Sequence, residues 1–167
     1  MKRYKEFYYT NPQMVKDLIA ITPIDLNDKV LDAGSGDGVW FNNLKTPQKF
    51  ECEIERGCDF YEWDKKVDWV IGNPPFHESW KFFDMASRIT QKGIALLINN
   101  LAFNSWTPRR YETMKERGFY LTRLHIVQDS RWFGRYYYLI FTKKRNNFVS
   151  WNTKTYKLTN SLKIKDL

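Results

Sequence analysis

The chain has 167 residues, a net charge of +8, a hydrophobic content of 43% and an aromatic content of 17%. This length and composition fit one folded domain with its own core, and they favour a folded protein over a disordered one. The longest apolar runs, such as residues 94–98, are too short to span a bilayer, and the first residues lack the apolar segment of a signal peptide. We therefore expect a cytoplasmic protein without membrane contact.

Hydrophobic periodicity and turn residues predict helices and strands that alternate along the chain. Asn11 and Pro12 are suitable as the N-cap and first residue of the first helix. In chain order we expect a helix at 11–20, a strand at 29–32, a helix at 39–44, strands at 50–55 and 67–71, a helix at 78–90, a strand at 93–99, a helix at 109–117, and a hairpin of strands at 120–127 and 136–143. Residues 58–63 are expected to form a connecting loop or turn, and residues 100–108 are expected to be a loop. This order predicts an α/β fold with a mostly parallel sheet, helices on both faces and one antiparallel strand in the C-terminal hairpin.

The cysteines and histidines predict no bound metal. Cys52, Cys58, His77 and His125 match no standard metal-ligand spacing. Two cysteines are also too few for a disulfide framework. We expect both thiols to be free and buried or half-buried.

The charge is unevenly distributed along the chain. Residues 143–167 carry seven Lys or Arg and one acid, whereas residues 51–68 carry seven acids and three bases. A basic tail beside an acidic segment predicts a polyanionic partner next to a pocket for a cationic or hydroxyl-rich group. The alternative is that the lysines only solvate the surface.

Polar or conformationally unusual residues lie at the ends of four of the expected strands. They are 32–34, 53–55, 73–76 and 99–100. In open α/β sheets, ligands bind beyond the carboxyl ends of the strands. The coincidence therefore predicts a binding site at this edge of the sheet.

The first of these segments is a glycine loop, residues 34–38, preceded by Asp32. Its Gly-x-Gly-x-Gly spacing differs from the Gly-x-Gly-x-x-Gly fingerprint of dinucleotide sites. Asp32 would repel a pyrophosphate and would favour the amine of a zwitterion. Glu53 can accept hydrogen bonds from ribose hydroxyls, and Ile54 can cover one face of an adenine. Together these residues favour a nucleoside with an amino-acid tail over NAD.

The segment Asn73-Pro74-Pro75-Phe76 ends an apolar run at 67–71. Two consecutive prolines lack backbone donors and fix φ, so the strand must stop and its tip must be stiff. Such a tip suits a site that holds a flat substrate between an aromatic ring and hydrogen-bond acceptors. The alternative is a purely structural proline end before a helix.

Residues 30–38 together with Asn73-Pro74-Pro75-Phe76 resemble the class I S-adenosylmethionine (SAM)-dependent methyltransferases, and within them the N6-adenine type of amino-methyltransferase. Residues 8–12 resemble the Phe-x-Thr-Pro type segment that flanks the cofactor's methionine part in one subset, although Asn11 is inserted between Thr10 and Pro12. The resemblance runs from about residue 8 to residue 143. It implies a Rossmann-like fold, SAM as the cofactor, a methyltransferase domain at 1–145 and a basic extension at 146–167.

The resemblance also implies cofactor-binding residues. They are Tyr9, Thr10, Asp32, Gly34, Ser35, Gly36, Glu53, Ile54, Asp59, Phe60 and Asn73. The glycine loop would line the methionine end, Glu53 the ribose, and Ile54 the adenine. Asp59 and Phe60 match an acid-aromatic pair near the adenine amino group, and the alternative for Asp59 is a plain loop acid.

The expected catalytic residues are Asn73, Pro74, Pro75 and Phe76. The Asn73 side-chain oxygen and the Pro74 carbonyl would accept the two N–H groups of an exocyclic amine, and Phe76 would stack on the base. The residues expected to contact the substrate are His77, Arg131, Trp132, Phe133 and Arg135. The alternative for Trp132 and Phe133 is packing in the core under the hairpin.

We therefore expect a SAM-dependent N6-adenine methyltransferase that acts on nucleic acid, with DNA favoured. The alternatives are RNA as the acceptor, the glutamine amide of a protein as the acceptor, and a non-catalytic nucleic-acid-binding subunit. Little of the chain is left for a dedicated target-recognition region. Recognition would either be short and lax or come from the tail, a homodimer or a partner subunit.

Overall fold

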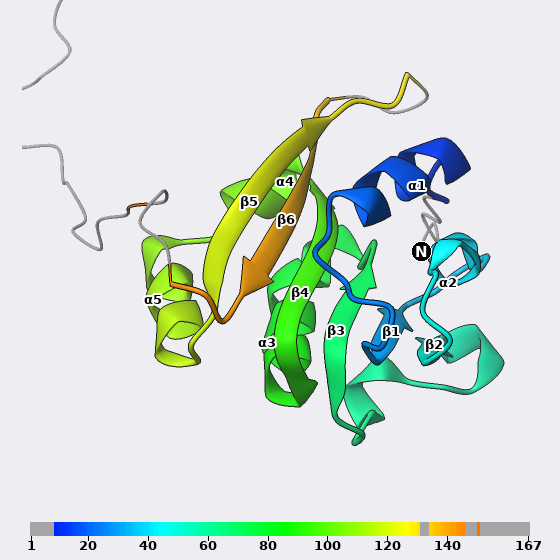
Figure 1. The fold of residues 1–167 in the computed structure, drawn as a ribbon. Helices are drawn as coiled ribbons and strands as arrows, with labels where there is room; N and C mark the ends of the chain where they lie inside the picture. Colours follow the sequence, from blue (N-terminus) through cyan, green and yellow to red (C-terminus); the bar gives the residue numbers. More distant parts are fainter. Residues whose placement is uncertain (1–8, 131–133, 146–149, 151–167) are drawn as a thin grey trace, which may run out of the picture.

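The computed structural model describes residues 9–130, 134–145 and 150, and its centre is a six-stranded sheet (Figure 1). The strand order is β2-β1-β3-β4-β6-β5. The strands are β1 (Val30–Ala33), β2 (Lys49–Cys52), β3 (Val67–Gly72), β4 (Thr90–Asn99), β5 (Tyr120–Val127) and β6 (Tyr136–Thr142). The α-helices are α1 (Pro12–Ala20), α2 (Val39–Asn43), α3 (Ser79–Ile89), α4 (Asn100–Asn104) and α5 (Pro108–Glu116). None of the helices in the described ranges has the length and apolar character needed to span a membrane.

The sheet is mostly parallel, as the sequence predicts. β1 pairs in parallel with both β2 and β3, and β3 pairs in parallel with β4. β6 is antiparallel to both of its neighbours, β4 and β5. The predicted C-terminal hairpin and its single antiparallel strand are therefore confirmed.

Helices cover both faces of the sheet (Figure 1). On one face, Val15 and Leu18 of α1 and Trp40 of α2 pack against inward-facing residues of β1, β3, β4 and β6. On the other face, Phe83 of α3 and Met114 of α5 lie in a second buried cluster with the alternate residues of the same strands. The alternation follows from the two-residue period of a strand, and it gives one core on each side of the sheet.

Helix α1 begins where its sequence predicts. The Asn11 side chain accepts hydrogen bonds from the backbone N–H groups of Gln13 and Met14, at 2.9 and 3.4 Å, and Pro12 is the first helical residue. After the helix, the Thr22 hydroxyl lies 2.8 Å from the Tyr138 hydroxyl, 116 residues further along the chain. The buried hydroxyl pair attaches the N-terminal helix to β6.

Two expected segments differ in the structure. The expected strand at 50–55 ends at Cys52, because the Glu53 carboxylate accepts the Glu55 N–H at 3.3 Å and starts a 3₁₀ turn, η1 (Ile54–Arg56). Residues 100–108 are not wholly a loop, because the Asn99 side chain accepts the Ala102 N–H at 2.8 Å and caps α4. Two further 3₁₀ turns, η2 (Phe60–Glu62) and η3 (Phe76–Glu78), follow β2 and β3.

The expectation of two free thiols is wrong. Cys52 and Cys58 form a disulfide, with their Cα atoms 5.1 Å apart. The η1 turn reverses the chain, and the Cys58 N–H donates to the Glu53 carbonyl at 3.1 Å, which returns Cys58 to the end of β2. The disulfide therefore closes the short loop that carries Glu53 and Ile54.

Candidate active site

The predicted residues in segments 32–36, 53–60 and 73–76 lie at or just after the carboxyl ends of β1, β2 and β3. From β1 the chain passes through α2, on one face of the sheet, to β2. From β3 it passes through α3, on the opposite face, to β4. Because β1 and β3 are neighbours, their connections leave a crevice between them, which is the usual ligand site of an open α/β sheet.

The glycine loop, residues 34–38, is attached to the end of β2. The N–H groups of Gly34 and Ser35 donate to the Cys52 carbonyl at 2.8 and 3.1 Å. Gly36 has a φ of +54°, in the left-handed region that favours glycine, and its N–H donates to Glu53 Oε2 at 2.7 Å. The loop is therefore shaped partly by the acid that was expected to bind a ribose.

Two residues that sequence reasoning missed, Glu51 and Arg56, complete this network. Arg56 Nη1 donates to the Gly36 carbonyl at 2.8 Å, and its Nη2 donates to Ser35 Oγ at 2.6 Å and to Glu51 Oε2 at 2.8 Å. The Ser35 hydroxyl in turn donates to Glu51 Oε2 at 3.1 Å. The buried Ser35 side chain thus binds its own protein.

Asp32, at the end of β1, is fully buried. Its Oδ2 accepts the Phe41 N–H at 2.9 Å, which holds the start of α2 against the sheet. Its Oδ1 is buried and finds no hydrogen-bond donor among the residues that the structure describes. Burial raises the pKa of Asp32 to about 7, and the nearby Glu51 charge acts in the same direction. A buried carboxylate oxygen without a donor fits the positively charged amine expected from the sequence.

The residues expected to bind ribose and adenine are not equally accessible. Ile54 is 67% exposed, so its side chain can lie against a ring. Asp59 Oδ1 accepts the Tyr61 N–H at 2.8 Å and starts η2. Phe60 is buried, and its ring centroid lies 4.3 Å from that of Phe82 in the core. Ile54 is therefore the apolar side chain of this group that is available to an adenine.

Asn73 and Phe76 follow β3, the parallel neighbour of the strand β1 that precedes the glycine loop. The Asn73 side-chain Nδ2 donates to the Thr10 hydroxyl at 3.2 Å, and Trp40 Nε1 donates to the same oxygen at 3.3 Å. These bonds fix the direction of the Asn73 amide. Phe76 starts η3 and is half-buried, with its ring centroid 5.9 Å from that of Tyr136 at the start of β6.

The remaining predicted residues differ in their exposure, and some lie outside the described part of the chain. Tyr9 is half exposed, and its ring lies against Gly36. His77 and Arg135 are exposed. Arg131, Trp132 and Phe133 lie outside the described residues, and so does the alternative that the two aromatic residues pack under the hairpin. In the described part of the chain, no group of three or more His, Cys, Asp or Glu residues could hold a metal.

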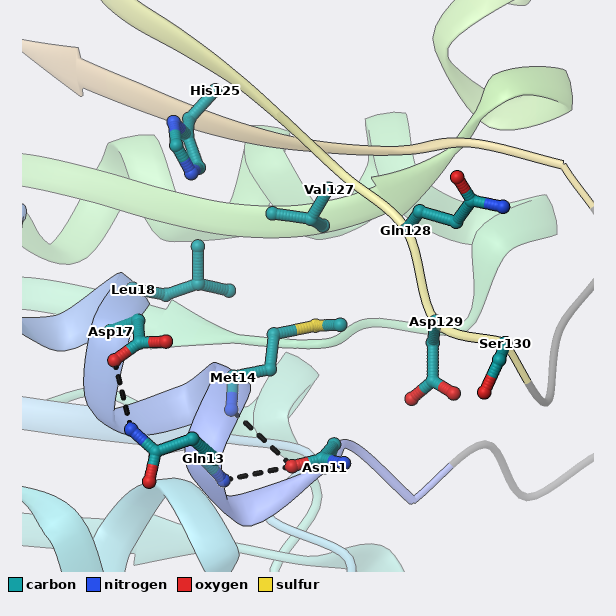
Figure 2. A pocket seen from close by; sticks show the side chains of 10 residues that line it. All are labelled: Asn11, Gln13, Met14, Asp17, Leu18, His125, Val127, Gln128, Asp129 and Ser130. Carbon is teal, nitrogen blue, oxygen red and sulfur yellow. Dashed lines mark hydrogen bonds between the residues drawn. The ribbon is translucent and has the colours of Figure 1, made fainter.

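A groove of about 430 Å³ opens beside the candidate centre (Figure 2). It lies between α1 and the end of β5, and its lining residues are Asn11, Gln13, Met14, Asp17, Leu18, His125, Val127, Gln128, Asp129 and Ser130. One wall continues from Asn11 to Thr10, which binds Asn73. On the other wall, Val127 pairs with Tyr136, which contacts Phe76. Both walls therefore lead to Asn73-Pro74-Pro75-Phe76.

Comparisons with known proteins identify the fold. No protein-family model matches the chain, and no curated protein sequence matches it significantly. TrmN from Thermus thermophilus matches with a TM-score of 0.61 and 17% identity over 81% of this chain and 49% of that one, so the chain spans about half the length of TrmN. The 23S rRNA methyltransferase ErmE matches with a TM-score of 0.65 and 13% identity, covering 86% of this chain and 72% of ErmE.

A further solved structure with the same fold contains a bound cofactor product. Magnesium protoporphyrin IX methyltransferase, ChlM, from Synechocystis with bound S-adenosylhomocysteine (SAH) matches with a TM-score of 0.61 and 14% identity, over 80% of this chain and 83% of ChlM. A second structure of ChlM holds SAM. The chain therefore has the Rossmann-like methyltransferase fold, and its relatives in fold act on both RNA and a small molecule.

Proposed function

We propose that this chain is a SAM-dependent N6-adenine methyltransferase that acts on nucleic acid, with DNA as the favoured acceptor. One observation carries the proposal. Asn73-Pro74-Pro75-Phe76 and the glycine loop follow neighbouring parallel strands, β3 and β1, at the point where the chain connections diverge. A cofactor held at one segment and a planar amine held at the other would meet in the crevice between them.

The cofactor side of the crevice suits SAM. SAM supplies a methyl group that is bonded to a positively charged sulfur and can be transferred to a nucleophile. Asp32 Oδ1 would accept hydrogen bonds from the amine of the methionine part, since it is buried and finds no donor among the described residues. Glu53 would accept the ribose hydroxyls beside its bond to the Gly36 N–H, and the exposed Ile54 would cover the adenine.

The acceptor side suits an exocyclic amine. The lone pair of such an amine is delocalised into its ring, so the nitrogen is a poor nucleophile. The bond of Asn73 Nδ2 to Thr10 orients the amide, so that the Asn73 side-chain oxygen would accept one amine N–H and the Pro74 carbonyl the other. These fixed acceptors would stabilise the positive charge that develops on the nitrogen. Phe76 would stack on the base and align the nitrogen with the methyl group.

The groove between α1 and β5 would admit the acceptor. Asp17 and Asp129 disfavour a phosphate inside the groove, whereas Met14 and Leu18 provide an apolar floor for a base. A paired adenine would therefore have to be flipped out of its stack or supplied single-stranded. Arg135, together with Arg131, would contact adjacent phosphates, and His77, Trp132 and Phe133 would contact the base. The basic extension at 146–167, a second copy or a partner subunit would provide further recognition.

RNA is the second candidate acceptor. It is supported by the likeness of the chain to the 23S rRNA methyltransferase ErmE. The residues of the crevice would serve an adenine of either polymer, because the distinction rests on contacts to the 2′-hydroxyl.

The proposal is tested by incubating the full chain with methyl-labelled SAM and, in parallel, single-stranded DNA, duplex DNA, RNA and protein. Nucleoside digestion and mass spectrometry then identify the product. We expect N6-methyldeoxyadenosine, with the largest yield from DNA. N6-methyladenosine from RNA alone would favour the second candidate. Label in protein alone, label at cytosine, or no transfer would contradict the proposal.

The Asn73→Ala variant tests the role of the amide. Its turnover should fall by at least about a hundredfold, by analogy with the loss of one preorganised hydrogen bond at an oxyanion site. Asn104→Ala makes the same chemical change at an exposed residue of α4 and should leave turnover unchanged. Equal turnover of the Asn73→Ala variant and the wild type would refute the assigned mechanism.

A further inference from the structure

The peptide groups around Gly36 are held from both sides by residues that follow β2. The Gly36 N–H donates to Glu53 Oε2 at 2.7 Å, and the Gly36 carbonyl accepts Arg56 Nη1 at 2.8 Å. Gly36 has a left-handed φ of +54°, a conformation that glycine adopts at little cost. Because glycine can also adopt many others, an unrestrained loop would leave this conformation readily. Glu53 and Arg56 thus limit the loop to one of its accessible shapes.

The second arm of Arg56 extends this restraint to the neighbouring residue. Its Nη2 donates to Ser35 Oγ at 2.6 Å and to Glu51 Oε2 at 2.8 Å. A planar guanidinium can make these bonds together because its donors diverge in a fixed fork, whereas the ammonium of lysine concentrates its donors on one atom. The loop is therefore held by the geometry of arginine as well as by its charge.

The ion pair of Arg56 with Glu51 is not a strong source of stability. Both side chains are well exposed, at 47% and 38% of their area, and solvent screens such pairs. The two Arg56 Nη atoms are already bound to the protein, so Arg56 can act on a ligand through the loop. Because the ion pair adds little to stability, replacing Arg56 should change the shape of the loop more than the free energy of unfolding.

We infer that Arg56 is a positioning residue for the cofactor. By fixing the Gly36 carbonyl and the Ser35 hydroxyl, it holds the glycine loop in the shape that receives the methionine and ribose parts of SAM. The inference rests on the proposed function, because it takes SAM as the ligand. It does not depend on the acceptor, since the loop lies on the cofactor side of the crevice.

The test measures SAM and SAH binding to the full chain by isothermal titration calorimetry, with the melting temperature recorded for every variant. Arg56→Met keeps most of the alkyl stem and removes the fork. Its dissociation constant for both ligands should rise about tenfold, as expected for the loss of a charge-assisted restraint, while its melting temperature stays close to that of the wild type. Arg56→Lys restores the charge and should recover only part of the affinity.

Arg88→Met is the matched control. Arg88 makes an exposed ion pair with Asp84 at 2.9 Å on α3, so the same substitution removes a comparable pair outside the glycine loop. Its affinity for SAM should equal that of the wild type. Millimolar guanidinium should restore part of the SAM affinity of Arg56→Ala and should have no effect on Arg88→Met, a result that a purely structural role would not produce.

The failure of this inference can be distinguished from the failure of the proposed function. If the wild type binds neither SAM nor SAH, the cofactor assignment fails and the inference fails with it. If the wild type binds and Arg56→Met binds equally well, only the inference is overturned. If Arg56→Met unfolds, Arg56→Lys decides, and a lysine variant with full SAM affinity overturns the inference. In steady-state assays, Arg56→Met should have a raised KM for SAM and an unchanged kcat.

Discussion

The side chain of Asn73 donates a hydrogen bond to the hydroxyl of Thr10, at 3.2 Å and across 63 residues of sequence. The Thr10 oxygen also accepts the Trp40 indole N–H at 3.3 Å, and Thr10 is almost completely buried. An amide has one donor side and one acceptor side. Binding the donor side to Thr10 therefore sets the direction of the acceptor side, from which the proposed contact with the substrate amine would be made.

This relationship predicts a role for the Thr10 hydroxyl in turnover. Thr10→Val keeps the shape of the side chain but removes the acceptor for both Asn73 and Trp40, so the Asn73 amide can rotate. We expect kcat to fall about tenfold, equivalent to about 1.4 kcal/mol in the activation free energy. Thr10→Ser keeps the hydroxyl and should retain most of the activity. Steady-state kinetics at saturating SAM measure both, and equal kcat values for the valine and serine variants would contradict the prediction.

Asp32 predicts a pH dependence of stability. Burial raises its pKa from 3.8 to about 7, so the folded protein binds this proton more tightly than the unfolded chain does. The Asp32 proton therefore contributes to the free energy of unfolding. This contribution is fully present below about pH 4 and is lost as the pH rises through 7, and between these values it falls by about 1.4 kcal/mol per pH unit. Asp32→Asn cannot titrate at this position.

The measurement is urea unfolding at several pH values from 5 to 8. As the pH rises, the free energy of unfolding of the wild type should fall relative to that of Asp32→Asn, because only the wild type must bury a charge. A difference that is constant over this range would show that Asp32 is ionised throughout.

The backbone at Gly72 predicts a large effect of a single methyl group. Gly72 has a φ of +149°, and a Cβ atom there would lie 2.7 Å from the carbonyl oxygen of Ala33 on the neighbouring strand. Gly72→Ala should therefore lower the free energy of unfolding by about 3 kcal/mol. Gly57→Ala is the control, since Gly57 also has a positive φ, of +80°, but has no atom within 4 Å of the added carbon. Denaturant unfolding should show a loss of only about 1 kcal/mol for this control.

The Cys52–Cys58 disulfide predicts sensitivity to reductant. Thiol titration of the denatured chain should find no reactive thiol before reduction and two after it. Reduction should lower the free energy of unfolding by about 2 kcal/mol, as estimated for a short closed loop. The double variant Cys52→Ala/Cys58→Ala should be equally stable with and without reductant. Two reactive thiols in the untreated protein would contradict the prediction.

The parts of the fold that could be predicted from sequence depend on local chemistry. Asn11 and Pro12 set the start of α1 through a side-chain cap and a fixed φ, and both are visible in the sequence. The alternation of apolar strands with helices, and the hairpin at the end, are likewise local patterns that determine the sheet. Helix α4 was missed because its start depends on the side chain of Asn99, which also ends a buried strand.

The parts of the site that could not be predicted depend on long-range contacts. The bond of Arg56 to Gly36 joins residues 20 apart in sequence, and it forms because β1 and β2 end side by side. The Cys52–Cys58 pairing depends on the η1 turn, which interrupts a segment with strand-like alternation. Phe60 carries the aromatic character that its motif requires, but only the packed core shows that Phe82 covers its ring.

The hydroxyl pair of Thr22 and Tyr138 has a consequence for the synthesis of the protein. Helix α1 leaves the ribosome before the strands of the sheet, yet one of the strands against which it packs, β6, is made more than a hundred residues later. Thr10 lies just before α1, so its contact with Asn73 depends on the same late docking. A nascent chain would therefore carry the glycine loop and Asn73 well before it could align them, and the centre would become competent only when translation had passed β6.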